Sequence, residues 1–140
     1  MRRLCDIYNK ISENNIELFS YEMVDKDAVT IRYRGIYGIF VDYRKLNSSE
    51  AEFMALSHEY GHCKSGTTHK LHSSYQLIEQ HENRANRAAV HELLPYENLI
   101  DAVNKGNTEL WQIAEYLDIP EAFAKMAIDV YEKECYYNNM

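Results

Sequence analysis

The sequence predicts an α+β fold in which a small, mainly antiparallel sheet is followed by helices. Three observations lead to this prediction. Segments rich in β-branched and aromatic residues fall within the first 42 residues, an H-E-x-x-H motif at helical spacing follows them, and the pattern is helical from residue 77 onwards. A chain of 140 residues suits a single domain, with a helical C-terminal subdomain over residues 96–140 that follows residues 1–95.

The composition is that of an ordinary globular protein, with 46% hydrophobic and 26% charged residues. No apolar run approaches 18 residues and the N-terminus lacks a signal-peptide core, so we expect a cytoplasmic protein that does not bind membranes. The net charge is −7, and residues 96–140 carry nine acidic residues against three lysines. This acidic surface disfavours direct binding of nucleic acid.

The first predicted element is an amphipathic helix over residues 2–13, where apolar side chains recur at helical spacing. Three strands are then predicted, at residues 16–23, 28–33 and 39–42. In the second strand Val29, Ile31 and Tyr33 alternate with polar residues, which predicts that one face is buried. The third strand directly precedes the motif helix, and its edge could pair with an extended peptide.

The H-E-x-x-H motif consists of His58, Glu59 and His62. On a helix, residues four apart lie on one face, so the two imidazoles can bind one metal ion. Glu59 is one step round the helix, from where its carboxylate can take a proton from a water at the metal site. The motif therefore predicts a metal centre with an adjacent general base.

The motif helix has clear boundaries. Asn47 or Ser49 can cap its start, and Gly66 can end it. The residues predicted to face inward are Ala51, Met54, Ala55, His58 and His62.

A second helix over residues 77–94, stopped by Pro95, offers the third metal ligand. Its inward stripe begins with Glu82, and Asn86 lies one turn further along the same face, where it can accept a hydrogen bond from the outer nitrogen of a ligating histidine. The full stripe is Glu82, Ala85, Asn86, Ala89 and Leu93. Other donors on these two helices point 100° to 180° away, namely Cys63, His81 and His91.

Residues 63–77 are polar and unpatterned, so we expect a loop over the site. Tyr75 is the hydroxyl we favour for stabilising an oxyanion during catalysis. His69 and His72 in the loop are alternatives for the same role.

In the C-terminal part the sequence predicts helices at residues 96–104, 109–117 and 121–134. Residues 113–125 have the spacing of a helix-turn-helix, but the would-be recognition helix begins with Glu121, which disfavours DNA binding. The side chains predicted to form the core of this part are Trp111, Ile113, Ala114, Leu117, Phe123, Ala127 and Val130.

The two motifs together resemble the signature of the ImmA/IrrE family of metallopeptidases. His58-Glu59-Tyr60-Gly61-His62 is similar to its H-E-x-G-H helix, and the segment from Glu82 to Pro95 is similar to its E-x-x-A-N/D-x-x-A…L-x-P helix. The likeness covers about residues 28–130, and the strand before the motif and the helices after Pro95 also resemble the short members carried by phages and mobile elements. Two positions depart from the pattern: Ala88 stands where an aromatic residue is common, and Asn86 stands where thermolysin-like enzymes usually carry aspartate.

The resemblance implies a minimal zincin-like (thermolysin-like) endopeptidase. It implies one Zn2+, or another divalent metal, held by His58, His62 and Glu82, with Glu59 as general base. The implied substrate is a helix-turn-helix repressor whose cleavage derepresses phage or mobile-element genes. The alternative is a non-catalytic regulatory protein that keeps the metal and acts by binding its repressor partner.

Overall fold

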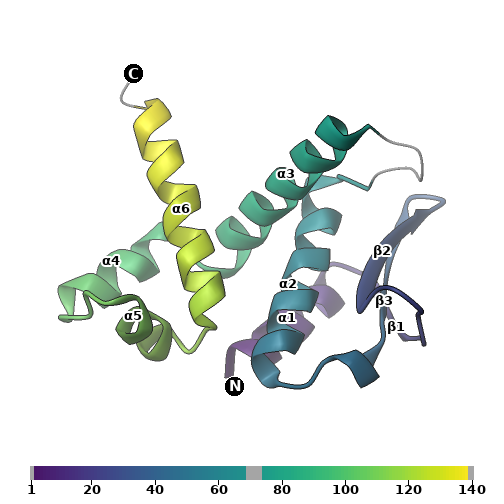
Figure 1. Cartoon of the computed structure of the whole chain (residues 1–140), viewed down its shortest axis with the longest axis horizontal. Coiled ribbons are helices and arrows are strands. Elements are labelled where there is room, and N and C mark those ends of the chain that lie inside the picture. Colours follow the sequence, from purple (N-terminus) through teal and green to yellow (C-terminus); the bar gives the residue numbers. More distant parts are fainter. Residues whose placement is uncertain (1, 69–73, 139–140) are drawn as a thin grey trace.

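A helix and three strands form the first part of the chain. The computed structural model describes residues 2–68 and 74–138, with the backbone alone at Arg2, Tyr75 and residues 136–138. The elements are α1 (Arg2–Glu13), β1 (Glu17–Ser20), β2 (Ala28–Tyr33) and β3 (Ile36–Val41). Figure 1 shows the sheet at one side of the molecule, with α1 and α2 on the same side of it. Each of these elements lies where the sequence predicts it, to within a few residues.

The sheet is mixed, with the strand order β1-β3-β2. β2 and β3 form an antiparallel hairpin, whose turn residues Arg34 and Gly35 both have positive φ, as a two-residue hairpin turn requires. β1 pairs with β3 in parallel. The predicted antiparallel arrangement therefore holds for β2 and β3 only. β3 lies in the centre of the sheet, so the prediction that the strand before the motif helix offers a free edge is wrong, and the edge strands are β1 and β2.

The predicted alternation of buried and exposed residues is not observed in β2, because burial decreases from the start of the strand to its end. Ile31 and Tyr33 are 48% and 68% exposed, whereas Ala28 is buried and Thr30 contacts α2. The first half of the strand, with Ala28 and Thr30, packs against α2, whereas the second half is exposed on both faces. The prediction of one buried face therefore fails for the second half of β2.

Helix α2 (Ser49–Ser65) carries the H-E-x-x-H motif. Its N-cap is Ser48, whose hydroxyl accepts a hydrogen bond from the Ala51 amide, and not either of the predicted caps. Gly66 ends the helix in the left-handed conformation, as predicted. Of the predicted inward stripe only His62 is buried. The fully buried apolar side chains lie on a neighbouring face and are Phe53, Leu56 and Tyr60.

Helix α3 (Tyr75–Leu93) runs across α2. Its Ala85 and Ala89 are fully buried and Leu93 nearly so, which confirms the predicted stripe on this helix. Small side chains at two of these positions let the two helix backbones approach closely. α3 therefore holds its polar residues Glu82 and Asn86 near the motif.

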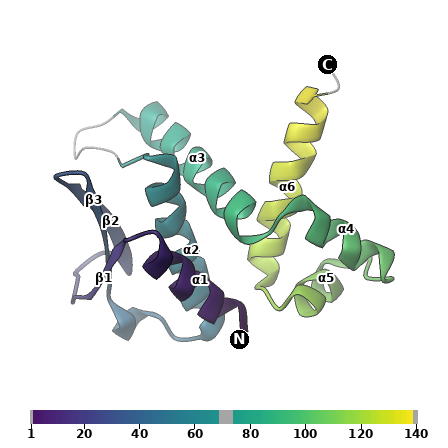
Figure 2. The same cartoon turned by 180° about the vertical axis from the view of Figure 1, so that it is seen from behind.

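Three helices form the C-terminal part: α4 (Tyr96–Asn104), α5 (Leu110–Leu117) and α6 (Glu121–Asn138). Figure 2 shows them at the end of the molecule opposite the sheet. The predicted core residues are buried except Trp111, which is 54% exposed. Trp111 lies in the first turn of α5, and on so short a helix the covered face is taken by Ile113, Ala114 and Leu117. No helix among the described residues is long and apolar enough to cross a membrane.

Candidate metal centre

The site is built where α2 and α3 cross. A Cβ atom added to Gly61 would lie 2.1 Å from the backbone oxygen of Ala85 and 3.2 Å from the Cβ of Ala89. Glycine at this position therefore allows a distance between the helices that no other residue permits. In the sequence Gly61 stands between His58 and His62, so the two helices approach each other closely at the motif itself.

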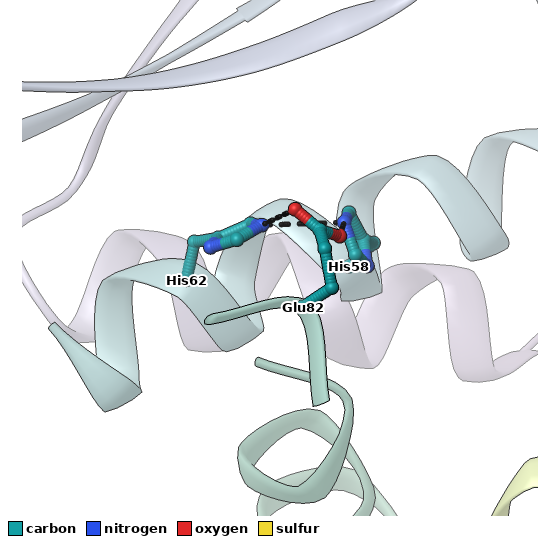
Figure 3. A group of neighbouring side chains, drawn as sticks. All are labelled: His58, His62 and Glu82. Atoms are coloured by element: carbon teal, nitrogen blue, oxygen red, sulfur yellow. Dashed lines mark hydrogen bonds and ion pairs between the residues drawn. The ribbon is translucent and has the colours of Figure 1, made fainter. Parts of the chain in front are cut away.

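At this crossing His58, His62 and Glu82 converge, as Figure 3 shows. The Nε2 atom of His58 lies 2.6 Å from Glu82 Oε2, and the Nε2 atom of His62 lies 3.1 Å from Glu82 Oε1. The two Nε2 atoms are 3.2 Å apart. His62 is buried, while His58 and Glu82 keep about a third of their side-chain surface exposed, so the cluster is open to one side.

The outer nitrogens of both imidazoles are fixed by oxygen atoms. His62 Nδ1 donates to the carbonyl oxygen of Thr67 at 2.6 Å. Thr67 reaches it because Gly66 reverses the chain at the end of α2. His58 Nδ1 lies 3.1 Å from Asn86 Oδ1, which is the contact predicted for Asn86. Each hydrogen bond orients its ring and places the proton on Nδ1 in the neutral imidazole.

The donor set fits a metal cation. With the protons on Nδ1, both Nε2 atoms direct lone pairs towards the carboxylate oxygens of Glu82, so acceptors face acceptors at 2.6 to 3.2 Å. A positive ion between these atoms removes that repulsion. A tetrahedral ion with bonds of about 2.1 Å spaces its ligand atoms about 3.4 Å apart. The distances of 3.1 and 3.2 Å from His62 Nε2 to Glu82 and to His58 are close to this spacing, and the 2.6 Å between His58 and Glu82 would widen when an ion binds.

Glu59 lies beside this cluster and is 8% exposed. It does not belong to the group of ligand atoms that lie within 4.8 Å of one another, so its carboxylate is not one of the three converging donors. Its Oε1 atom accepts a hydrogen bond from the Thr30 hydroxyl of β2 at 2.9 Å. The carboxylate is thus held between α2 and the sheet.

A polar network links α2 and α3 to Asn14, the residue that follows α1. The hydroxyl of Tyr60, which is fully buried, accepts from Asn14 at 3.2 Å and donates to Glu92 at 3.4 Å. Burial and the Glu92 carboxylate raise the pKa of Tyr60 to about 12, so the hydroxyl remains a donor. Lys64 lies 3.7 Å from Glu92 and donates to Asn14. This network fixes the position of α2 relative to α3.

The other candidate donors lie elsewhere or outside the described residues. Burial raises the pKa of the Cys63 thiol to about 12, whereas a cysteine binds metal as the thiolate. His91 pairs with Glu134 of α6 at 2.7 Å, on the side of α3 turned away from the site. Three predicted residues have side chains outside the described residues: Tyr75, of which the backbone alone is described, and His69 and His72.

Two residues of the site were not predicted. Thr67 follows Gly66, the glycine that ends α2, and the chain reversal there brings the Thr67 carbonyl back to His62. The position of Gly66 in the sequence could therefore have indicated this contact. Thr30 lies 29 residues before Glu59, and only the packing of β2 on α2 brings the two together. No local pattern in the sequence indicates that contact.

An H-E-x-x-H helix that meets a glutamate on a second helix, beside a small sheet, defines a zincin-like domain. The chain belongs to the peptidase family M78, described as the IrrE N-terminal-like domain, whose profile matches residues 9–129. This confirms the resemblance to the ImmA/IrrE family. Comparisons with curated proteins and with solved structures gave no match. Family membership and the three converging residues together support a metallopeptidase-like role.

Proposed function

We propose that the protein is a zinc-dependent endopeptidase that hydrolyses a peptide bond by activating water. The observation that supports it most strongly is the convergence of His58, His62 and Glu82, with the outer nitrogen of each imidazole held by an oxygen atom. Two imidazoles and one carboxylate are a ligand set typical of catalytic zinc, which keeps a position open for water or substrate. Membership of a peptidase family supports the same reaction.

Three residues of the site would bind the metal ion, and a fourth takes part in proton transfer. His58, His62 and Glu82 would hold the ion, which when bound supplies Lewis acidity for both the water and the scissile carbonyl. Glu59 accepts the proton from the attacking water and delivers it to the leaving amine. The neutral Asn86 amide orients His58 without the additional charge of a carboxylate, so it raises the basicity of the imidazole less than an aspartate would.

The structure offers one sheet edge near the site for an extended peptide. β2 pairs with β3 on one side only, and its Thr30 touches Glu59. A peptide that added a strand to β2 would run past the general base, with its main chain fixed by hydrogen bonds. We propose β2, in place of the strand before the motif helix, as the docking edge.

From the family resemblance, we propose that the substrate is a helix-turn-helix repressor and that its cleavage derepresses phage or mobile-element genes. The second candidate function is a non-catalytic regulator that holds the metal and binds the same repressor. The side chains of His58 and Glu82 are about one third exposed, which favours the enzyme, because a purely structural metal site is normally closed to solvent.

The experiment compares wild type with Glu59→Gln in two assays. In the first, each purified protein is loaded with Zn2+ and incubated with fluorescein-labelled casein. In the second, each protein is co-expressed with a helix-turn-helix repressor, and cleavage of the repressor is followed. We expect wild type to cleave, and the variant to keep its metal but to lose roughly 100- to 10,000-fold in turnover. Glu50→Gln, at an exposed position of the same helix, is the matched control. Equal cleavage by Glu59→Gln would remove Glu59 from the mechanism. Binding of the repressor without any cleavage by wild type would favour the non-catalytic regulator.

A further inference from the structure

The contact between Thr30 and Glu59 joins an edge strand to the H-E-x-x-H helix. The Thr30 hydroxyl oxygen lies 2.9 Å from Glu59 Oε1 and 3.1 Å from the backbone oxygen of Glu59. An ionised carboxylate can only accept, so the hydroxyl donates its single proton to Glu59. Hydrogen bonds to a charged acceptor are stronger than neutral ones, which favours the carboxylate over the backbone oxygen.

This contact holds one of the two carboxylate oxygens. Among the described residues, no other side chain hydrogen bonds to the Glu59 carboxylate. Oε1 is therefore anchored, and Oε2 is left for a proton that arrives from the site. A glutamate side chain has three rotatable bonds, so a single fixed oxygen limits the positions that the other can reach.

The position of Thr30 is itself well determined. It pairs with Ile39 in the centre of the antiparallel hairpin, and Ile39 is fully buried. Threonine is branched at Cβ, so few side-chain conformations are open to it in a strand. The strand thus presents the hydroxyl to Glu59 from a rigid element, whereas Glu59 itself projects from α2.

We propose that Thr30 is a positioning residue for Glu59: its hydroxyl fixes the carboxylate in the orientation from which it accepts the proton of the attacking water. The inference rests on the proposed function, because it assigns a role in that reaction. It also predicts a conformational effect that is independent of the reaction. A misplacement of about 1 Å in a reacting group lowers a rate on the order of 100-fold, which sets the size of the effect.

A purely structural role is the competing explanation. Thr30 also approaches the Glu59 backbone oxygen, and that contact alone would tie β2 to α2. Removal of the hydroxyl would then lower thermal stability but leave the turnover of the folded enzyme unchanged. Both explanations allow a lower Tm when the hydroxyl is removed, but only the positioning role predicts a lower kcat.

The test compares wild type with Thr30→Val, which replaces the hydroxyl by a methyl group of similar size, and Thr30→Ser, which restores a hydroxyl. With zinc content matched, we expect Thr30→Val to lower kcat by about 10- to 100-fold and to change KM by less than about twofold. Thr30→Ser should recover most of the lost kcat. Ile36→Val, at an exposed position of the neighbouring strand β3, is the control for general effects on the hairpin and should match wild type.

A crystal structure of metal-free Thr30→Val provides the second measurement. We expect the Glu59 side chain to leave its wild-type orientation or to occupy more than one. Unchanged kcat in Thr30→Val, in an enzyme that Glu59→Gln inactivates, would overturn the inference and leave the proposed function intact. Failure of Thr30→Ser to recover activity, or a Glu59 side chain that does not move, would also overturn it. If wild type cleaves nothing, the proposed function fails, and the crystal structure still tests whether Thr30 holds Glu59.

Discussion

Replacement of Gly61 by alanine tests whether the close helix crossing creates the metal centre. The added Cβ would lie 2.1 Å from the backbone oxygen of Ala85 and 2.9 Å from its carbonyl carbon. Nonbonded carbon and oxygen atoms need more than about 3 Å, so the helices must separate locally by on the order of 1 Å. Metal–ligand distances tolerate deviations of only about 0.2 Å, so Glu82 on α3 would no longer reach the histidines on α2.

Two opposite effects act on stability in this variant. Glycine to alanine in a helix interior favours folding by about 1 kcal/mol, because the unfolded chain loses conformational freedom. Overpacking costs about 1–3 kcal/mol, and here the obstacle is backbone, which cannot rotate away. We therefore expect Gly61→Ala to lower the free energy of unfolding by up to about 2 kcal/mol. We also expect it to weaken zinc binding more than about 100-fold, beyond the 10- to 100-fold loss typical when a supporting hydrogen bond is removed.

Zinc affinity is measured by competition with a chromogenic chelator, and stability by thermal unfolding in the presence of a chelator. Gly38→Ala is the matched control, because a Cβ there meets only the rings of Phe19 and Phe40 at 3.4 Å or more. Addition of Ala85→Gly should not rescue Gly61→Ala, since the nearest atom belongs to the backbone of residue 85. If Gly61→Ala unfolds at a higher temperature than wild type and binds zinc equally well, the reasoning about the crossing is refuted.

Three further predictions concern a supporting side chain, an ion pair and the core. Asn86→Ala should weaken zinc affinity about 10- to 100-fold in the same competition assay, because His58 loses the acceptor of its outer nitrogen. The Arg44 guanidinium and the Met23 amide hold the pKa of the Asp42 carboxyl well below its usual range, so the charged carboxylate stabilises the fold above about pH 4 and this contribution is lost as the pH falls further. Asp42→Asn should accordingly be less stable than wild type at pH 7, with a difference that shrinks at acidic pH in denaturant titrations. Phe123→Ala should cost about 3–5 kcal/mol in the same titrations, whereas substitution of the tryptophan in α5 by alanine should cost less, because about half of that side chain remains in water.

The positions of helices and strands could be predicted because local signals mark their ends. Gly66 and Pro95 stop two helices at the expected places, and helical spacing identifies the inward stripe of α3. The arrangement of the strands could not be predicted, since β3 inserts between β1 and β2 and no local pattern encodes that order. The prediction of the inward face of α2 was also wrong. This helix packs against the sheet, α1 and α3 at once, so its buried residues do not form a single stripe.

Much of the site could be predicted because its chemistry depends on spacing along single helices. Two histidines four residues apart, and Asn86 four residues after Glu82, place side chains on common faces in any α-helix. The structure brings these residues together. The hydroxyl of Thr30 escaped prediction because its contact with Glu59 depends on tertiary packing between a strand and a helix.

The most direct test of the metal centre is the zinc content of purified protein, measured by inductively coupled plasma mass spectrometry on wild type, Glu82→Ala and Glu79→Ala. Glu79 lies exposed on the same helix and serves as the control. One zinc ion per chain is expected in wild type and in Glu79→Ala, with almost none in Glu82→Ala. A wild type that binds no divalent metal, or a Glu82→Ala variant that keeps a full equivalent, would contradict the account.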